Sequence, residues 1–184
     1  NWVMIPHVTN HDDADITDLE AFRVQFNKEN EKAGVKVSML AFMIKAAVAT
    51  LKKFPEFNAS LDGDNLILKK YWHIGFAADT PQGLVVPVVK HADRLSLLEL
   101  AREIERLAVQ SRAGRARPEE LTGSTFTITS LGAKGGLLAT PVINYPEVAI
   151  LGVHRIRQVP VVRDGQIVIR DVMNVSLSSD HRVV

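Results

Sequence analysis

The chain contains no cysteine, and this absence removes several kinds of chemistry. Disulfides, thiolate metal ligands and a cysteine nucleophile are all excluded, so a thiol in the reaction of this protein has to come from a substrate. No apolar run reaches the roughly 18 residues of a membrane-spanning helix, and we expect no membrane partner. The net charge is only +1, so the overall charge gives no reason to expect nucleic acid as a partner.

What remains is the composition of an ordinary globular domain. Hydrophobic residues make up 46% of the 184 residues and charged residues 23%, which is close to the average for folded domains. A chain of this length can bury a substantial core, and we expect a single domain. No internal repeat or low-complexity segment divides the sequence.

Three stretches carry the signals of a helix start. Thr17 and Ser96 each stand three residues before a glutamate, which is the capping-box pattern, and Ser38 precedes a long apolar run. The second stretch is apolar nearly all round, which predicts a deeply buried helix. The predicted helices run from Thr17 to about Gly34, from Ser38 to Pro55 and from Ser96 to about Arg112.

Most of the remaining chain has the β-branched or alternating character of strands. Pro6 makes the first of them an edge strand or a bent strand. Long helices that alternate with several strands indicate an α/β fold in which helices pack on a mixed sheet. The predicted strands are residues 2–10, 73–79, 83–90, 124–130, 147–153 and 173–180, with hairpins at 57–71 and 159–172 that turn at Asp62–Asn65 and Asp164–Gly165.

Two motifs that would indicate a ligand are incomplete. The glycines at 132, 135 and 136 fit neither the dinucleotide-binding nor the P-loop spacing, so we interpret them as part of a turned or flexible loop. His7 and His11 stand four residues apart beside several aspartates, but the metal-binding form of this spacing requires a helix. We therefore expect no metal. The remaining isolated histidines, at positions 73, 91 and 154, are interpreted as surface or packing residues.

His181 differs from these histidines in its context. It follows an alternating strand and stands between Asp180 and Arg182. A neutral imidazole with a pKa near ~6.5 is a competent general base at neutral pH. The sequence pattern by itself does not identify the group with which it would exchange a proton.

Several segments, taken in order, resemble one family. SLSSDHRVV resembles the active-site motif Asp-His-Arg-x-x-Asp-Gly of the 2-oxo acid dehydrogenase acyltransferases, and the first 23 residues resemble the opening of their catalytic domain. FNASL, HIGFAADTPQGLVVPV, GSTFTITSLGAKGG and TPVINYPEVAILGV match further characteristic segments. The resemblance is strongest to the acetyltransferases of pyruvate dehydrogenase complexes. It implies the two-layer, mixed-sheet fold of coenzyme A-dependent acyltransferases, similar to chloramphenicol acetyltransferase.

The resemblance also sets expectations about domains. We expect residues 1–184 to be an acyltransferase catalytic domain that is truncated at its C-terminus, because the family motif continues with Asp-Gly beyond Val184. The lipoyl and peripheral subunit-binding domains, which precede this domain in the family, are expected to be absent. Thr129 stands where many relatives carry serine, and it keeps the hydroxyl group.

The implied reaction transfers an acetyl group from the S-acetyldihydrolipoyl arm to coenzyme A. A thiol with a pKa near ~8.5 is mostly protonated at pH 7. His181 would take this proton as the thiol attacks the thioester, and the Thr129 hydroxyl would donate a hydrogen bond to the oxyanion, a contact worth about 3 kcal/mol. The residues that bind coenzyme A stay unknown at this point.

Ser130 is the alternative to Thr129. Strand alternation points the two hydroxyls to opposite faces of the sheet, so a register error of one residue would exchange their roles. On pattern alone, Thr129 could also be a threonine selected for strand propensity. Asp180 and Arg182 are interpreted as structural clamps beside His181.

The family architecture implies homotrimers with shared active sites, assembled into a cubic or icosahedral core. Lipoyl domains would deliver the acyl group, and the pyruvate dehydrogenase and dihydrolipoamide dehydrogenase components would bind through domains outside this chain. The implied compartment is the bacterial cytoplasm, or the mitochondrial matrix for a eukaryotic protein. Three alternatives stay open: transfer of a succinyl or branched-chain acyl group, O-acetylation of an antibiotic by an enzyme of the same fold, and a non-catalytic scaffold.

Overall fold

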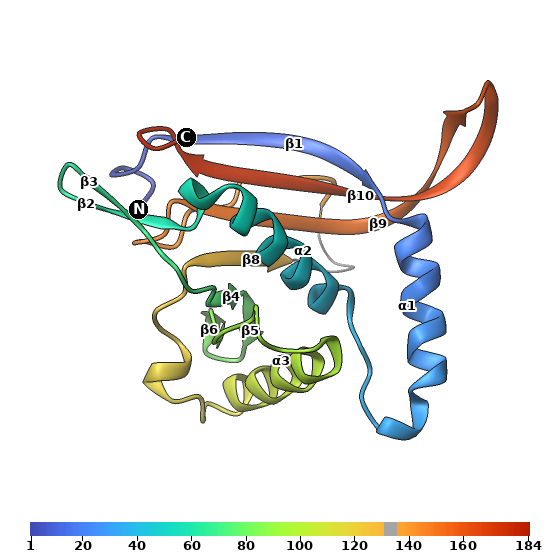
Figure 1. The fold of residues 1–184 in the computed structure, drawn as a ribbon, viewed down its shortest axis with the longest axis horizontal. Helices are drawn as coiled ribbons and strands as arrows, with labels where there is room; N and C mark the ends of the chain where they lie inside the picture. Colours follow the sequence, from blue (N-terminus) through green and yellow to red (C-terminus); the bar gives the residue numbers. More distant parts are fainter. Residues whose placement is uncertain (131–135) are drawn as a thin grey trace.

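A mixed sheet of six strands forms the centre of the computed structural model, which describes residues 1–130 and 136–184 (Figure 1). β8 runs parallel to β4 and β9, and the other neighbours are antiparallel. β1 lies at the sheet edge, as Pro6 predicted, but it begins only at His7. From edge to edge the strands are β1 (His7–Asp15), β10 (Gln166–Asp180), β9 (Ala149–Arg163), β8 (Phe126–Ser130), β4 (Ile74–Phe76) and β7 (Val88–Val89).

Helices cover one face of this sheet (Figure 1). α2 (Met39–Lys53) and α3 (Leu97–Arg112) pack on it, while α1 (Thr17–Glu29) stands at one end, next to β10. The predicted α/β fold with a mixed sheet and two layers is confirmed. None of the helices in the described ranges is long and apolar enough to span a lipid bilayer. The smaller elements are the hairpins β2 (Ala59–Asp62) with β3 (Asn65–Leu68) and β5 (Ala78–Thr80) with β6 (Gly83–Val85), and 3-10 turns at Glu31–Ala33, Pro55–Phe57 and Pro118–Glu120.

The predicted helix starts are in the right places, but only one cap has the predicted contacts. At α3, the Ser96 hydroxyl accepts a hydrogen bond from Glu99 N, and the Glu99 carboxylate accepts one from Ser96 N. Ser38 precedes α2 without a capping hydrogen bond. The capping box at Thr17 is wrong, because Thr17 is already helical and its hydroxyl donates to Asp15 and accepts from the main chain of β10. These bonds tie α1 to the sheet instead of capping the helix.

The strand predictions place the turns correctly and the lengths wrongly. Residues 73–79 and 83–90 each divide in two, because β4 and β7 pair in the main sheet while β5 and β6 form their own hairpin. Residues 147–180 form only two long strands, β9 and β10, where three segments were predicted. They turn at Asp164 and Gly165, both with positive φ, as expected for a tight hairpin.

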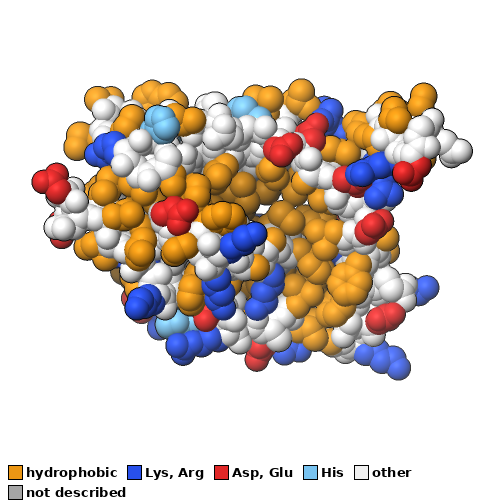
Figure 2. All heavy atoms as spheres, turned by 45° about the horizontal axis from the view of Figure 1, so that its top comes forward, with side chains coloured by type: hydrophobic (Ala, Val, Ile, Leu, Met, Phe, Trp, Pro, Cys, Tyr) orange, Lys and Arg blue, Asp and Glu red, His pale blue; other side chains and the backbone are white. Residues whose placement is uncertain are grey.

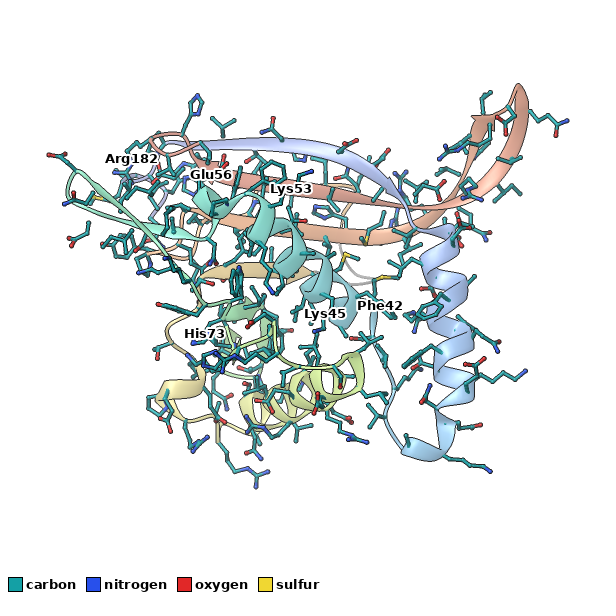
Figure 3. The ribbon with its side chains drawn as sticks, viewed as in Figure 1. Phe42, Lys45, Lys53, Glu56, His73 and Arg182 are labelled. Atoms are coloured by element: carbon teal, nitrogen blue, oxygen red, sulfur yellow. The ribbon has the colours of Figure 1, made fainter. Side chains whose placement is uncertain are left out.

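The prediction that α2 is a deeply buried helix holds for one face only. Its buried positions lie on one face, since the sheet and α3 cover only part of the helix. On its other side, Phe42 meets Phe22 of α1 edge to face, with 6.0 Å between ring centroids (Phe42 is labelled in Figure 3). The buried positions are Ala41, Ile44, Ala47, Val48 and Leu51.

Two elements extend from the body of the molecule and leave apolar side chains exposed. α1 buries none of its residues, and Phe22 remains 53% exposed. The tip of the β9–β10 hairpin reaches beyond the sheet (Figure 1) and exposes Val162, Ile167 and Ile169. Figure 2 shows how broadly apolar side chains spread over one face of the molecule. Exposed apolar area of this kind is typical of a surface that another protein chain covers.

The two faces of the sheet differ in chemistry because side chains alternate along each strand. Toward the helices, Phe126 and Ile128 of β8 belong to the main core. On the opposite face, the same strand presents the hydroxyls of Thr127 and Thr129. The alternation therefore makes the second face the polar face of the sheet, and the candidate site lies there.

Candidate active site

Thr129 lies in the middle of the sheet, on its polar face. It stands on β8 directly opposite Gly152 of β9. It lines a cavity of about 440 Å³, together with Thr127, Pro141 and His154. A ligand oxygen in this cavity could accept a hydrogen bond from the Thr129 hydroxyl, which is the contact that an oxyanion requires.

Ser130, the alternative candidate, lines a different cavity, beside Met39 and Met43 of α2. The two hydroxyls thus serve opposite faces of the sheet, as strand alternation predicted. The glycine-containing loop that was predicted to follow them falls mostly on residues 131–135, which lie outside the described residues.

His181 lies in the turn that follows β10, at one end of the sheet. Its main-chain N–H donates to Pro6 O at 2.9 Å. Its ring Nδ1 stands 2.8 Å from the main-chain oxygen of Val184. Because an oxygen of this kind only accepts, Nδ1 carries a proton, and in the neutral ring Nε2 is then the nitrogen with the free lone pair. The ring is exposed, so Nε2 is available to a substrate as a general base.

Asp180 and Arg182 hold this turn in place. The Arg182 guanidinium donates to the buried Asp180 carboxylate at 2.6 Å, and Arg182 N donates to the same carboxylate at 3.1 Å. Burial acts to raise the pKa of Asp180, but the hydrogen bonds and the charge of Arg182 outweigh burial and lower this pKa. Figure 3 labels Arg182 at the end of the sheet. These contacts agree with the predicted role of both residues as clamps.

One chain does not bring His181 and Thr129 together. In the register of the sheet, Thr129 is level with Gly152 and Gly152 is level with Ser176. His181 stands five residues beyond Ser176, which is about 16 Å along the strand direction at about 3.3 Å per residue. It also lies two strands across, at about 4.8 Å per strand. A hydrogen-bonded site that contains both side chains therefore needs a second chain.

A row of polar groups crosses the sheet beside Thr129. The Ser176 hydroxyl lies 2.8 Å from His11 Nδ1 and 2.9 Å from His154 Nε2, so it joins β1, β10 and β9. Ser176 is fully buried and His154 is 6% exposed. Burial first, and then the charge of His11, lower the pKa of His154. His154 Nδ1 has no hydrogen-bond partner among the described residues.

Glu147 is a second buried polar group near the cavity. Its side chain is hydrogen-bonded to Thr127 Oγ1 at 2.8 Å and to Asn144 Nδ2 at 3.2 Å. Burial raises the pKa of Glu147 to about 7, against the hydrogen bonds to Ser124, Thr127 and Asn144. The carboxyl group is thus protonated in a substantial part of the molecules at neutral pH.

Sequence reasoning missed Glu147 and treated His154 as a surface or packing residue. A signal was present in each case. Glu147 is a single acid directly before an apolar strand, and His154 interrupts that strand on the face of Gly152. Neither signal identifies the partner, because the partners come from other strands.

His7 is a structural residue. Its Nδ1 donates to Ile5 O at 2.7 Å, and its Nε2 accepts from Ile143 N at 3.0 Å, so both ring nitrogens are occupied. Within residues 1–130 and 136–184, no three histidine or acidic side chains form a group that could hold a metal ion.

Comparison with known proteins identifies the family. The model of the 2-oxoacid dehydrogenases acyltransferase (catalytic domain) family matches residues 1–184. A relative from Cupriavidus necator is 63% identical over 184 residues, which is all of this chain and 33% of that protein, and is named the dihydrolipoyllysine-residue acetyltransferase component of the pyruvate dehydrogenase complex. The chain belongs to the 2-oxoacid dehydrogenase acyltransferase family. It spans about one third of the length of this curated relative.

Solved structures agree with this assignment. Azotobacter vinelandii dihydrolipoamide acetyltransferase, studied for the role of a serine, a histidine and an asparagine in its catalytic mechanism, matches with a TM-score of 0.96 at 49% identity, over 100% of this chain and 76% of the other. The cubic core of the pyruvate dehydrogenase multienzyme complex matches with the same values. A chloramphenicol acetyltransferase matches with a TM-score of 0.55 at 13% identity, over 98% and 81% of the two chains, and shares the fold alone. The predicted fold type is thereby confirmed.

Proposed function

We propose that residues 1–184 form an acyltransferase catalytic domain that transfers an acetyl group from an S-acetyldihydrolipoyl arm to coenzyme A in a pyruvate dehydrogenase complex. The proposal is supported by the name of the Cupriavidus relative and by its 63% identity to the whole of this chain. That relative is bacterial, so we infer a complex of the bacterial cytoplasm.

In this proposal, His181 is the general base and Thr129 is the donor to the oxyanion. Nε2 of His181 takes the proton of the coenzyme A thiol while the sulfur attacks the acetyl carbonyl carbon. The carbonyl oxygen becomes negative and accepts a hydrogen bond from the Thr129 hydroxyl. The tetrahedral intermediate then expels the dihydrolipoyl thiolate, which recovers a proton from His181. The thiol proton is thus conserved, and no metal takes part in these steps.

The sequence spacing of the two residues supports this assignment. Thr129 and His181 stand 52 positions apart, the same spacing as between the serine and the histidine studied in the Azotobacter enzyme. Threonine in place of serine keeps the hydroxyl donor. Thr129 is therefore preferred over Ser130, which lines the cavity on the other face.

The observation that carries the proposal is the separation of the two groups. From a distance of about 16 Å along the sheet, we infer that His181 of one subunit acts on a substrate bound at Thr129 of another. The similarity to a cubic core supports such an assembly. The exposed apolar residues of α1 and the β9–β10 tip offer surface for it.

The cavity beside Thr129 favours a neutral acyl group over succinyl. Its polar side chains among the described residues, which include Thr127, Asn144 and His154, carry no carboxylate or ammonium group. Among the described lining residues, a succinyl carboxylate would lose its hydration without gaining a lysine or arginine partner, which is costly.

The simplest test replaces the base. His181→Ala in the assembled protein should lower kcat by about 100-fold or more with little change in the KM for coenzyme A, because general-base catalysis is typically worth 10²–10⁴. His91→Ala, at a histidine outside the proposed site, is the matched control and should keep normal turnover. Near-normal turnover of a folded His181→Ala protein would remove His181 from the mechanism.

A complementation experiment tests the shared site. His181→Ala and Thr129→Val chains are unfolded together and reassembled into mixed oligomers. A Thr129→Val chain can then supply its intact His181 to a neighbour with an intact Thr129, which creates a wild-type site about 10²-fold faster than either parent. The mixture should clearly exceed the mean of the parents. Activity that only averages, although mass spectrometry shows mixed oligomers, would place both residues in one chain.

A further inference from the structure

The imidazole of His154 lies close to Gly152 of the same strand. Gly152 stands two residues before it on the same strand and the same face. His154 Nε2 lies 3.4 Å from the position that a Cβ of residue 152 would take, and Pro141 Cγ lies 3.5 Å from it. Both are ordinary van der Waals distances, and the ring leans along the strand toward the Ser176 hydroxyl, 2.9 Å from Nε2.

The ring of His154 is also close to Thr129. Gly152 is the register partner of Thr129, and neighbouring strands are about 4.8 Å apart. Thr129 and His154 line the same cavity. When the carbonyl oxygen of a thioester binds the Thr129 hydroxyl, the alkyl chain of the acyl group is attached to the same carbonyl carbon. The imidazole of His154 therefore borders the space that this alkyl chain occupies.

The imidazole of His154 is held firmly and carries little charge. Ser176, which fixes Nε2 at 2.9 Å, is fully buried, and His11 contacts the same hydroxyl from the opposite side. Burial and the charge of His11 both lower the pKa of His154. A neutral, fixed ring excludes volume without attracting an anionic chain.

We propose that His154 is a specificity-determining residue that limits the size of the acyl group beside Thr129 and thereby favours acetyl over branched-chain acyl groups. The inference rests on the proposed acyl transfer and deepens it. It assigns the restriction on acyl size to the imidazole of His154, which the Ser176 hydroxyl holds close to Gly152.

The expected effect follows from the size of the ring. A pocket discriminates one methylene by about 10–200-fold, and isobutyryl exceeds acetyl by two carbon atoms. His154→Ala should therefore raise the ratio of kcat/KM for isobutyryl-dihydrolipoamide to that for acetyl-dihydrolipoamide by about tenfold or more. His154→Ser is the second variant, in case the alanine variant does not fold, which circular dichroism and thermal melting will show.

His11→Ala is the matched control, because His11 binds the same Ser176 hydroxyl but does not line the cavity. It should leave the ratio unchanged. Ser176→Ala frees the ring without removing it and should shift the ratio by less than His154→Ala. If His154→Ala lowers or raises both rates equally, or if His11→Ala shifts the ratio as strongly, the inference is wrong.

A binding measurement keeps the test independent of turnover. S-ethyl- and S-isobutyl-dihydrolipoamide are thioethers that carry chains of different size without reacting. Calorimetry should show that His154→Ala improves the relative affinity for the larger thioether about tenfold, and that His11→Ala does not. Absent acetyl transfer in the wild-type protein would refute the proposed function, whereas an unchanged affinity ratio would refute the role of His154.

Discussion

Replacing Glu147 with glutamine should stabilise the protein at alkaline pH. Glu147 is 3% exposed, and its Oε2 has no hydrogen-bond partner among the described residues. Burial raises its pKa from 4.5 to about 7. Glutamine has the same shape, can keep the contacts of Oε1 with Thr127 and Asn144, and cannot ionise. The variant therefore removes the cost of charging a buried carboxyl group.

The sign and size of the effect follow from proton linkage. Below about pH 4.5, Glu147 is protonated in both the folded and the unfolded chain and costs nothing. Between pH 4.5 and 7, the unfolded chain loses this proton while the folded chain keeps it, so the free energy of unfolding falls as the pH rises. Above pH 7 the loss is complete. A shift of this size corresponds to roughly 3 kcal/mol at about 1.4 kcal/mol per pH unit.

Urea denaturation at a fixed protein concentration, from pH 4.5 to 8.5, measures this difference. The free energy of unfolding of Glu147→Gln, minus that of the wild type, should grow by roughly 3 kcal/mol across this range. Glu120→Gln is the control: Arg117 first, and then Arg106, lower the pKa of Glu120 from 4.5 to about 2, so its contribution changes only below pH 4.5 and the difference for this variant should stay nearly flat across the range. A flat difference for Glu147→Gln would show that this carboxyl group ionises normally, and would refute the reasoning.

Substitutions at three further positions, with their controls, test other parts of the structure. Thr129→Ser should keep most of the activity, whereas Thr129→Val should lose roughly 10²-fold in kcat; a tolerated valine together with an inactive Ser130→Ala would transfer the oxyanion role to Ser130. Gly75→Ala should lower the melting temperature, because its Cβ would stand 2.8 Å from Val86 Cγ1 and 2.9 Å from Thr127 Oγ1, and an unchanged melting curve would mean that the neighbours relax without cost. Ser96→Ala should cost about 1 kcal/mol of unfolding free energy, and Ser38→Ala, at a cap without a side-chain bond, should cost less; equal costs would contradict the cap assignment.

The parts of the fold that depend only on residues close together in the sequence could be predicted. The capping box at Ser96 needs only Glu99, and the hairpin turn needs only Asp164 and Gly165. The cap at Thr17 could not be predicted correctly, because its hydroxyl bonds partly to β10, more than 150 residues away. The contact with the main chain of β10 replaced the predicted capping contact within the helix. No short sequence pattern contains information about a partner so far away in the sequence.

In the candidate site, too, the local features could be predicted from the sequence and the contacts between strands could not. Alternation along β8 predicted that Thr129 and Ser130 face opposite sides, and they line different cavities. The contact of His154 with Ser176 could not be predicted, because it depends on the register of β9 against β10. That register shifts at an irregularity between Met173 and Val175. A shift of this register by one residue would turn the Ser176 side chain to the other face of the sheet.

In the proposed mechanism, the positions of Thr129 and His181 make catalysis depend on assembly. Thr129 is held inside a sheet, and the turn of His181 is fixed by main-chain bonds to Pro6 and by the Asp180 clamp, so neither half can move about 16 Å to meet the other. A substitution that weakens association should therefore lower activity without touching either residue. Ile167→Asp at the exposed hairpin tip is such a change. Its activity should fall in parallel with the oligomer fraction seen by sedimentation, while circular dichroism stays unchanged. Full activity in a dissociated, folded subunit would show that one chain completes the site by itself.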